Sequence, residues 1–328
     1  MTQYLEKVAS PQVLENAWHF IRHHHGGWGC GESIEKIQSR LPDYLDELSE
    51  QLLTGTYHPD AMCCYVNIGQ GKGEVTCFSS LCDQLVQHAI LTVLTPLGKP
   101  IFNNGLPIQQ SPNAALVKVR DLVRSGYDWL GVARLENCID YIPYEPLLKN
   151  LYKLCGDKML VGIVRDILNS YPIEFRLLEK KGKGLPQNLI LTPWLSELYL
   201  HQFDNFLFHK DIVLVRVREE FAVFAQDKAA AQQALTIAAK QLKKLGLELN
   251  PEQSQVIRSS AEYTFLGKRL PNIEPWLPLK NGLKQLRGYG TSFQSNMANW
   301  LNTVRESSWL PRRLKNEPPV FDDWEVEK

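Results

Sequence analysis

Two apolar runs rich in β-branched residues lie between positions 213 and 225, and they flank the polar residues Arg218, Glu219 and Glu220. This pattern predicts two short strands joined by a tight turn, which together form a β-hairpin. Adjacent carboxylates at the tip of a hairpin are suited to holding divalent cations. The other predicted elements are arranged around this hairpin.

Elsewhere, apolar residues recur every three or four positions where helices are predicted and crowd into short runs where strands are predicted. A strand, two helices, a long helix, the hairpin, a further helix and strands then follow one another, which is the order of a split β-α-β palm-like domain. This order places Arg134, at the end of the first palm strand, beside Glu219 and Glu220. Helices are predicted over residues 10–21, 33–53 with a break at Pro42, 81–97, 111–125, 144–155, 158–170, 189–207 and 227–245, and strands over 61–78 as a pair, 129–134, 255–258 and 263–270.

The composition changes this picture in three ways. The 328 residues are 44% hydrophobic and 22% charged, and no apolar run is long enough for a membrane span. The 36 basic and 36 acidic residues cancel, which argues against a dedicated nucleic-acid binder because phosphate neutralisation needs a basic surplus. Seven cysteines without paired spacing favour reduced thiols and a cytoplasmic location.

Two local motifs suggest chemistry that the surrounding sequence does not favour. His23, His24 and His25 precede Cys30. Adjacent side chains at a helix end point in different directions, so a solvated helix end is preferred over a metal site. The glycine-rich segment 69–73 lacks the order of a phosphate-binding loop, and a hairpin turn is preferred there. We therefore expect no metal and no cofactor.

Several short motifs, in this order, resemble the reverse transcriptases encoded by group II introns. The resemblance covers most of residues 10 to 270 and implies a right-hand α+β fold. Fingers are then expected over residues 1–128, a palm over 129–270, and a short helical C-terminal appendage with an acidic tail over 271–328. The motifs are Asp83–Ala89, Asn104-Gly105-Leu106, Gly184-Leu185-Pro186-Gln187 with Thr192-Pro193, Leu245–Glu252, and Phe265-Leu266-Gly267.

The departures from the family pattern fall on its functional positions. The resemblance implies that the catalytic aspartates correspond to Arg134, Glu219 and Glu220. The metal site of the family would then be degenerate, with Arg134 as a counter-ion of the two glutamates. The nucleotide-binding positions are also altered, and they correspond to Lys72, Glu74, Gln187, Asn188 and Gln253.

We therefore predict a pseudoenzyme that acts as a scaffold or protein-binding subunit of a larger assembly. The alternative is a maturase-like splicing or chaperone factor that binds structured RNA. A polymerase that uses glutamates requires the assignment of Arg134 to be wrong. A solvated helical face with a frayed tail is the preferred interpretation of the C-terminal segment. A basic patch there would instead offer partner-binding candidates: Lys268, Arg269, Lys280, Lys284, Arg287, Arg312, Arg313 and Trp324.

Overall fold

A computed structural model describes residues 3–22, 34–69, 72–102, 112–170, 182–186, 189–260, 263–265 and 268–270. The chain divides into two compact units, Met1–Asn272 and Ile273–Lys328, and every described residue belongs to the first unit. The predicted helical appendage and the acidic tail lie outside the described residues.

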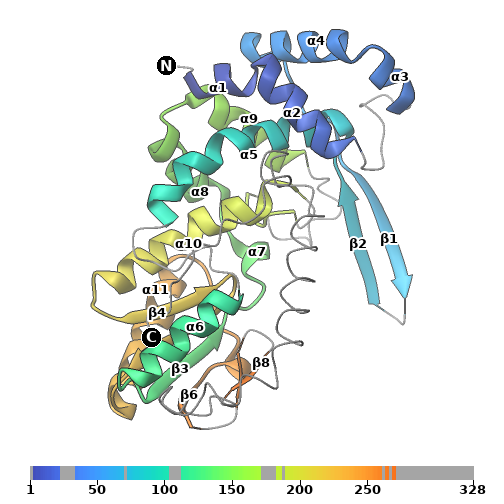
Figure 1. Ribbon diagram of the computed structural model, residues 1–328. Coiled ribbons are helices and arrows are strands. Elements are labelled where there is room, and N and C mark those ends of the chain that lie inside the picture. Colours follow the sequence, from blue (N-terminus) through green and yellow to red (C-terminus); the bar gives the residue numbers. More distant parts are fainter. Residues whose placement is uncertain are drawn as a thin grey trace, which may run out of the picture. The chain divides into compact units, whose positions relative to one another are not determined.

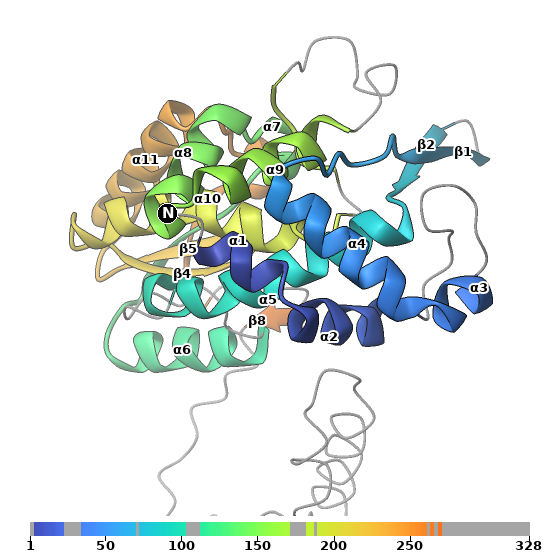
Figure 2. The same ribbon diagram turned by 90° about the horizontal axis from the view of Figure 1, so that it is seen from above.

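A four-stranded antiparallel sheet forms the palm-like part of the first unit (Figure 1). Its strand order is β4-β5-β3-β6, so the hairpin β4–β5 lies at one edge and pairs with β3 through β5. Two helices cover the sheet on opposite sides, α6 against β4 and α11 against β3 and β5 (Figures 1 and 2). The bounds are β3 Trp129–Arg134, β4 Val213–Val217, β5 Glu220–Ala225, β6 Gln255–Arg258, α6 Pro112–Arg124 and α11 Lys228–Lys244.

The rest of the first unit consists of helices and a two-stranded hairpin, and it includes the segment predicted to form the fingers. Strands β1 and β2 pair antiparallel from Cys63↔Phe78 to Gly69↔Lys72, and Figure 1 shows this hairpin projecting away from the helices. Helix α5 contacts α1 and α2 on the fingers side and α8 and α10 on the palm side. The bounds are α1 Gln3–Val8, α2 Pro11–Ile21, α3 Ile34–Ser39, α4 Leu41–Thr54, β1 Cys63–Gly69, β2 Lys72–Phe78, α5 Leu81–Phe102, α8 Tyr144–Cys155, α9 Lys158–Asn169 and α10 Thr192–Phe208.

One hydrophobic core runs through both parts. It includes Leu85 of α5, Leu147 of α8, Phe203 of α10 and Phe221 of β5, each with essentially no solvent exposure. Phe203 and Phe221 meet edge to face with ring centroids 5.3 Å apart, which is a favourable aromatic geometry. The palm-like sheet and the fingers-like helices are therefore packed on shared side chains.

Asp157 joins the N-terminal helix to the middle of the chain. Its carboxylate accepts a hydrogen bond from the backbone N–H of Leu160 and so caps α9 at 3.1 Å. The same carboxylate accepts from the backbone N–H groups of Tyr4 and Leu5 in α1, at 3.1 and 2.9 Å. A single buried side chain thus satisfies the free donors of two helix N-termini.

Most of the helices and strands predicted from the sequence are confirmed, and the differences are local. The predicted strand 263–270 is wrong as one element: β7 (Tyr263–Phe265) and β8 (Lys268–Leu270) instead pair antiparallel with each other. The break in the helix after Ser33 falls at Arg40, and Pro42 lies in the first turn of α4 where its missing N–H costs nothing. The short helices α1 and α7 (Cys138–Tyr141) were not predicted. Among the described residues, no helix is long and apolar enough to cross a membrane.

Candidate functional site

The tip of the hairpin β4–β5 lies against the end of β3. Val217 pairs with Glu220 and leaves a two-residue turn, in which Arg218 adopts a left-handed φ of 54°. Arg134 is the register partner of Glu220, and the backbone N–H of Leu135 donates to the carbonyl of Glu219 at 2.9 Å. Backbone pairing therefore brings the three residues together without any help from their side chains.

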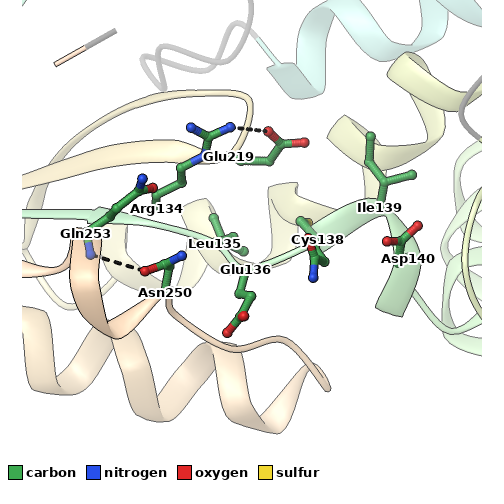
Figure 3. A pocket seen from close by; sticks show the side chains of 10 residues that line it. Arg134, Leu135, Glu136, Cys138, Ile139, Asp140, Glu219, Asn250 and Gln253 are labelled. Carbon is green, nitrogen blue, oxygen red and sulfur yellow. Dashed lines mark hydrogen bonds and ion pairs between the residues drawn. The ribbon is translucent and has the colours of Figure 1, made fainter. Parts of the chain in front are cut away.

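Arg134 forms ion pairs with both glutamates of the hairpin. Its Nη1 lies 3.6 Å from Glu220 Oε1 and its Nη2 lies 4.0 Å from Glu219 Oε2 (Figure 3 shows the pair with Glu219). The side chain of Arg134 is 46% exposed, and those of Glu219 and Glu220 are about one-third exposed. Ion pairs of this exposure contribute between 0 and about 1 kcal/mol to stability. They matter here because they place a positive charge between the two carboxylates of the hairpin.

A second arginine lies beneath the hairpin and is buried. Arg216 of β4 is 2% exposed and donates from Nε and Nη2 to Asp204 of α10 at 2.8 and 2.6 Å. It also donates to Glu197 of α10 at 2.8 and 3.3 Å, and its Nη1 donates to the carbonyl of Arg218 at 2.9 Å. Every direction of the guanidinium is thus hydrogen-bonded, and one of these bonds holds the turn itself.

Burial and the neighbouring charges shift the pKa values of Arg216 and Glu197 in this cluster. Burial alone would lower the pKa of Arg216, but the charges of Asp204 and Glu197 raise it above its usual value. Burial raises the pKa of Glu197, and the charge and hydrogen bonds of Arg216 partly oppose that rise. The pairing therefore keeps Arg216 charged in an interior position.

A cavity of about 310 Å³ opens beside Arg134 (Figure 3). Its walls come from the end of β3, from α7 and from the 3-10 helix η2 (Pro251–Gln253), with Glu219 contributed by the hairpin tip. Asn250 caps η2 by accepting from the backbone N–H groups of Glu252 and Gln253 at 3.0 and 3.2 Å. The residues that line the cavity are Arg134, Leu135, Glu136, Asn137, Cys138, Ile139, Asp140, Glu219, Asn250 and Gln253.

The cavity offers poor conditions for covalent or metal chemistry. Burial, reinforced by the nearby Glu219, raises the pKa of the Cys138 thiol to about 12, so this cysteine is not a thiolate nucleophile. No group of three or more potential metal-ligating side chains occurs within the described part of the chain. The two hairpin carboxylates do not fit a bound divalent cation, because the guanidinium of Arg134 already lies against both.

The other predicted site residues are spread over several places. Gln253 lies in η2 and lines the cavity. Lys72 and Glu74 lie on β2, and Lys268 and Arg269 lie on β8. The remaining predicted residues lie outside the described ranges: Gln187, Asn188, Lys280, Lys284, Arg287, Arg312, Arg313 and Trp324.

Sequence reasoning did not identify the buried cluster of Arg216, Asp204 and Glu197. Two signals were present. Arg216 interrupts an otherwise apolar strand, and a charge inside such a run calls for a buried partner. Glu197 and Asp204 are seven residues apart, two turns of a helix, and therefore share one face of α10.

The strand order places the hairpin tip beside the end of β3 in a mixed α+β protein built on an antiparallel sheet. Residues 75–270 match the family model described as reverse transcriptase (RNA-dependent DNA polymerase), which covers more than half of the chain. The chain therefore belongs to the reverse transcriptase family.

Individual relatives are distant. The group II intron-encoded protein LtrA of Lactococcus lactis subsp. cremoris is 23% identical over 319 residues, which cover 96% of this chain and 51% of LtrA. Protein YkfC of Escherichia coli K12 is 25% identical over 214 residues, which cover 62% of this chain and 56% of YkfC. The putative COX1/OXI3 intron 1 protein of Saccharomyces cerevisiae is 27% identical over 209 residues, 62% of this chain and 25% of that protein. The chain thus matches between a quarter and just over half of the length of these relatives.

Two solved structures match part of this chain with low sequence identity. A partial Cas6-RT-Cas1–Cas2 complex has a chain with 21% identity and a TM-score of 0.44, with 74% of this chain and 41% of that chain covered. Telomerase from Candida albicans has 13% identity and a TM-score of 0.47, with 65% and 44% covered.

Proposed function

We propose that this reverse transcriptase-family protein is catalytically inactive and serves as a non-enzymatic scaffold or protein-binding subunit of a larger assembly. The observation that supports this proposal is the pairing of Arg134 with Glu219 and Glu220 at 4.0 and 3.6 Å. Nucleotide addition needs two divalent cations held between carboxylates, and here a guanidinium lies between the strand end and the hairpin.

Electrostatics makes the exclusion of a dication substantial. Two unit charges about 4 Å apart interact by about 4 kcal/mol at an effective dielectric constant near 20, and a dication doubles this repulsion from Arg134. Arg134 cancels one of the two glutamate charges, so the three residues attract a dication with a net charge of −1 instead of the −2 of the glutamates alone. A magnesium ion would also lose the ligand that a carboxylate at position 134 would supply.

Two further features favour a binding role over an enzymatic one. The chain has zero net charge, so its surface carries no overall surplus for gripping a nucleic-acid backbone. Enzyme folds also serve as binding platforms after their chemistry is lost, because function resides in sites and not in the fold. The seven cysteines lack paired spacing, which favours reduced thiols and supports placing this platform in the cytoplasm.

Primer extension tests the proposal directly. The purified full chain is incubated with an RNA template, a DNA primer and deoxynucleotides in magnesium and separately in manganese, beside an active reverse transcriptase. We expect no extension above the no-enzyme control. Extension that disappears in Glu219→Gln and Glu220→Gln variants would overturn the proposal, because it would place the chemistry at this hairpin.

A metal-binding measurement tests the cause. Manganese binding, followed by electron paramagnetic resonance, should be weak in the wild type and at least about tenfold tighter in Arg134→Asp, since a repelling charge becomes a ligand. Arg124→Asp on α6 is the control, because Arg124 is exposed, pairs with Asp121 of its own helix and does not line the cavity beside Arg134. Equal manganese affinity in all three proteins would contradict the role of Arg134.

The second candidate function is binding of structured RNA without polymerase activity. It is favoured by the match to LtrA, an intron-encoded protein, over 96% of this chain, and by a 23% match to nuclear intron maturase 4 of Arabidopsis thaliana. Contacts to RNA shape and phosphates do not require the carboxylates of a polymerase site. A salt series distinguishes the two functions: affinity for a structured RNA that falls steeply with salt supports RNA binding, and no measurable affinity at low salt rejects it.

A further inference from the structure

The cavity beside Arg134 carries an excess of negative charge. Three of its lining residues are carboxylates, Glu136, Asp140 and Glu219, and one is a guanidinium, Arg134. Arg134 is already shared between Glu219 and Glu220. Glu136 and Asp140 make no ion pair among the residues that the structure describes. An anion entering this cavity would therefore meet two carboxylates that form no ion pair with a cation of the described residues.

The size and the lining of the cavity restrict its occupant further. A volume of about 310 Å³ lies at the lower end of the range for small-molecule sites, which begins at about 300 Å³. The cavity lining also includes the neutral polar residues Asn137 and Gln253 and the apolar residues Leu135 and Ile139. This combination suits a group with a cationic end and an aliphatic stem.

We infer that this cavity receives a lysine or arginine side chain of a partner protein. The cationic end of that side chain lies between Glu136 and Asp140, and its aliphatic stem lies against Leu135 and Ile139. The inference rests on the proposed scaffold function, and it names the chemistry by which the partner is recognised. The same electrostatics disfavour a nucleic acid here, because phosphate groups would be repelled where a basic side chain is attracted.

Short peptides provide the probe. Acetylated Gly-Arg-Gly amide, and the matched Gly-Gln-Gly and Gly-Glu-Gly amides, are titrated into the isotopically labelled full chain, and the backbone amide shifts are followed by NMR. We expect saturable shifts at Asn137 and Ile139 with the arginine peptide, and none with the glutamine or glutamate peptide. Shifts with all three peptides, or only at sites remote from the cavity, would overturn the inference.

Charge-neutral variants test the residues. The double variant Glu136→Gln and Asp140→Asn should lower the affinity for the arginine peptide by at least about fivefold, the fold-change that corresponds to about 1 kcal/mol of binding free energy. Glu145→Gln is the matched control, because Glu145 is exposed on α8 and does not line the cavity. Unchanged affinity in the double variant, with unchanged thermal melting, rejects the site. An inorganic triphosphate with magnesium that shifts the same amides also rejects it.

These outcomes are separable from the test of the proposed function. Absence of both primer extension and peptide binding removes the cavity as a recognition site and leaves the non-catalytic scaffold in place. Primer extension that depends on Glu219 and Glu220 removes the scaffold proposal itself.

Discussion

At the residue scale, the two arginines of the hairpin region differ in how much of the fold depends on them. Arg134 is half exposed, so water solvates its charge and those of its partners when a pair is broken. Arg216 is buried between Asp204 and Glu197, and removal of its charge leaves two carboxylates without a cation in the interior. The same substitution should therefore have very different effects at the two positions.

We predict that Arg216→Met destabilises the protein by about 3 to 5 kcal/mol, the cost of breaking one side of a buried ion pair. Arg134→Met, the matched control, should change the free energy of unfolding by less than about 1 kcal/mol. Urea denaturation followed by circular dichroism measures both. Equal losses in the two variants would show that the burial of Arg216 does not determine its contribution.

A buried carboxyl in the fingers-like part provides a titration that can be measured. Asp83 of α5 is 3% exposed, and it accepts from the hydroxyl of Tyr57 at 2.6 Å and from the backbone N–H of Asp60 at 3.0 Å. Burial raises the pKa of Asp83 from 3.8 to about 6, although the hydrogen bonds from Tyr57 and Asp60 oppose the rise. The folded state therefore holds a proton on Asp83 more tightly than the unfolded state does.

The sign of the pH dependence follows from this raised pKa. The contribution to stability is complete below pH 3.8 and is lost as the pH rises through about 6, and a difference of two pKa units corresponds to about 3 kcal/mol. We predict that the wild type loses up to this amount, relative to Asp83→Asn, between pH 4 and pH 7. Urea denaturation across that range measures it, with exposed Asp46→Asn as the control. A wild type and an Asp83→Asn variant with parallel pH profiles would refute the assignment.

At the element scale, local pattern was sufficient for the long helices and for the hairpin, and contacts distant in sequence decided the rest. The two apolar runs between 213 and 225 predicted β4, β5 and the meeting of Arg134 with the glutamates, because strand order alone determines it. Helix α7 has only four residues, too few for a helical hydrophobic period to predict it, and it follows Asn137, whose backbone is in the left-handed conformation. Ser10 occupies the N-cap position of α2, yet its hydroxyl donates to the carbonyl of Lys7 at the end of the unpredicted α1. Arg216 pairs with Asp204 and Glu197, which lie 12 and 19 positions before it in the sequence, and no local rule specifies that pairing.

The packing of α11 on the sheet yields a prediction about one glycine. A methyl group at Gly131 of β3 would lie 2.8 Å from Val223 Cγ2 and 3.1 Å from Leu235 Cβ. Gly131→Ala should therefore cost about 1 to 3 kcal/mol through overpacking. Gly162→Ala in α9 is the control, because its methyl group meets only the end of Arg165 at 4.0 Å, and alanine favours a helix by up to about 1 kcal/mol. A neutral Gly131→Ala, measured by denaturation, would mean that α11 can move away from the sheet.

At the scale of the whole molecule, fingers-like and palm-like parts share one core. The sequence divides the chain at residue 128, but the buried residues of α5 pack with those of α8 and α10 across that division. Helix α6, which precedes residue 128, contacts strand β4 of the palm-like sheet. Neither part therefore holds all of its own core residues.

We predict that fragments 1–128 and 129–272 do not fold when expressed separately, because each would expose the apolar face that the other covers. Each fragment should bind a hydrophobic dye and melt without a cooperative transition, whereas residues 1–272 together melt in a single step. Cooperative melting of either fragment alone would show that the two parts are independent folding units.

The carboxylate of Asp157 has a consequence for how the chain is made. Its bonds to the backbone of Tyr4 and Leu5 span about 150 residues, so these two N–H groups lack their carboxylate acceptor until the ribosome has passed position 157, although α5, which also contacts the first helix, is made earlier. At about 5 to 20 residues per second, synthesis of that stretch takes roughly 8 to 30 s. During that interval the start of the first helix lacks the capping carboxylate that it has in the folded protein.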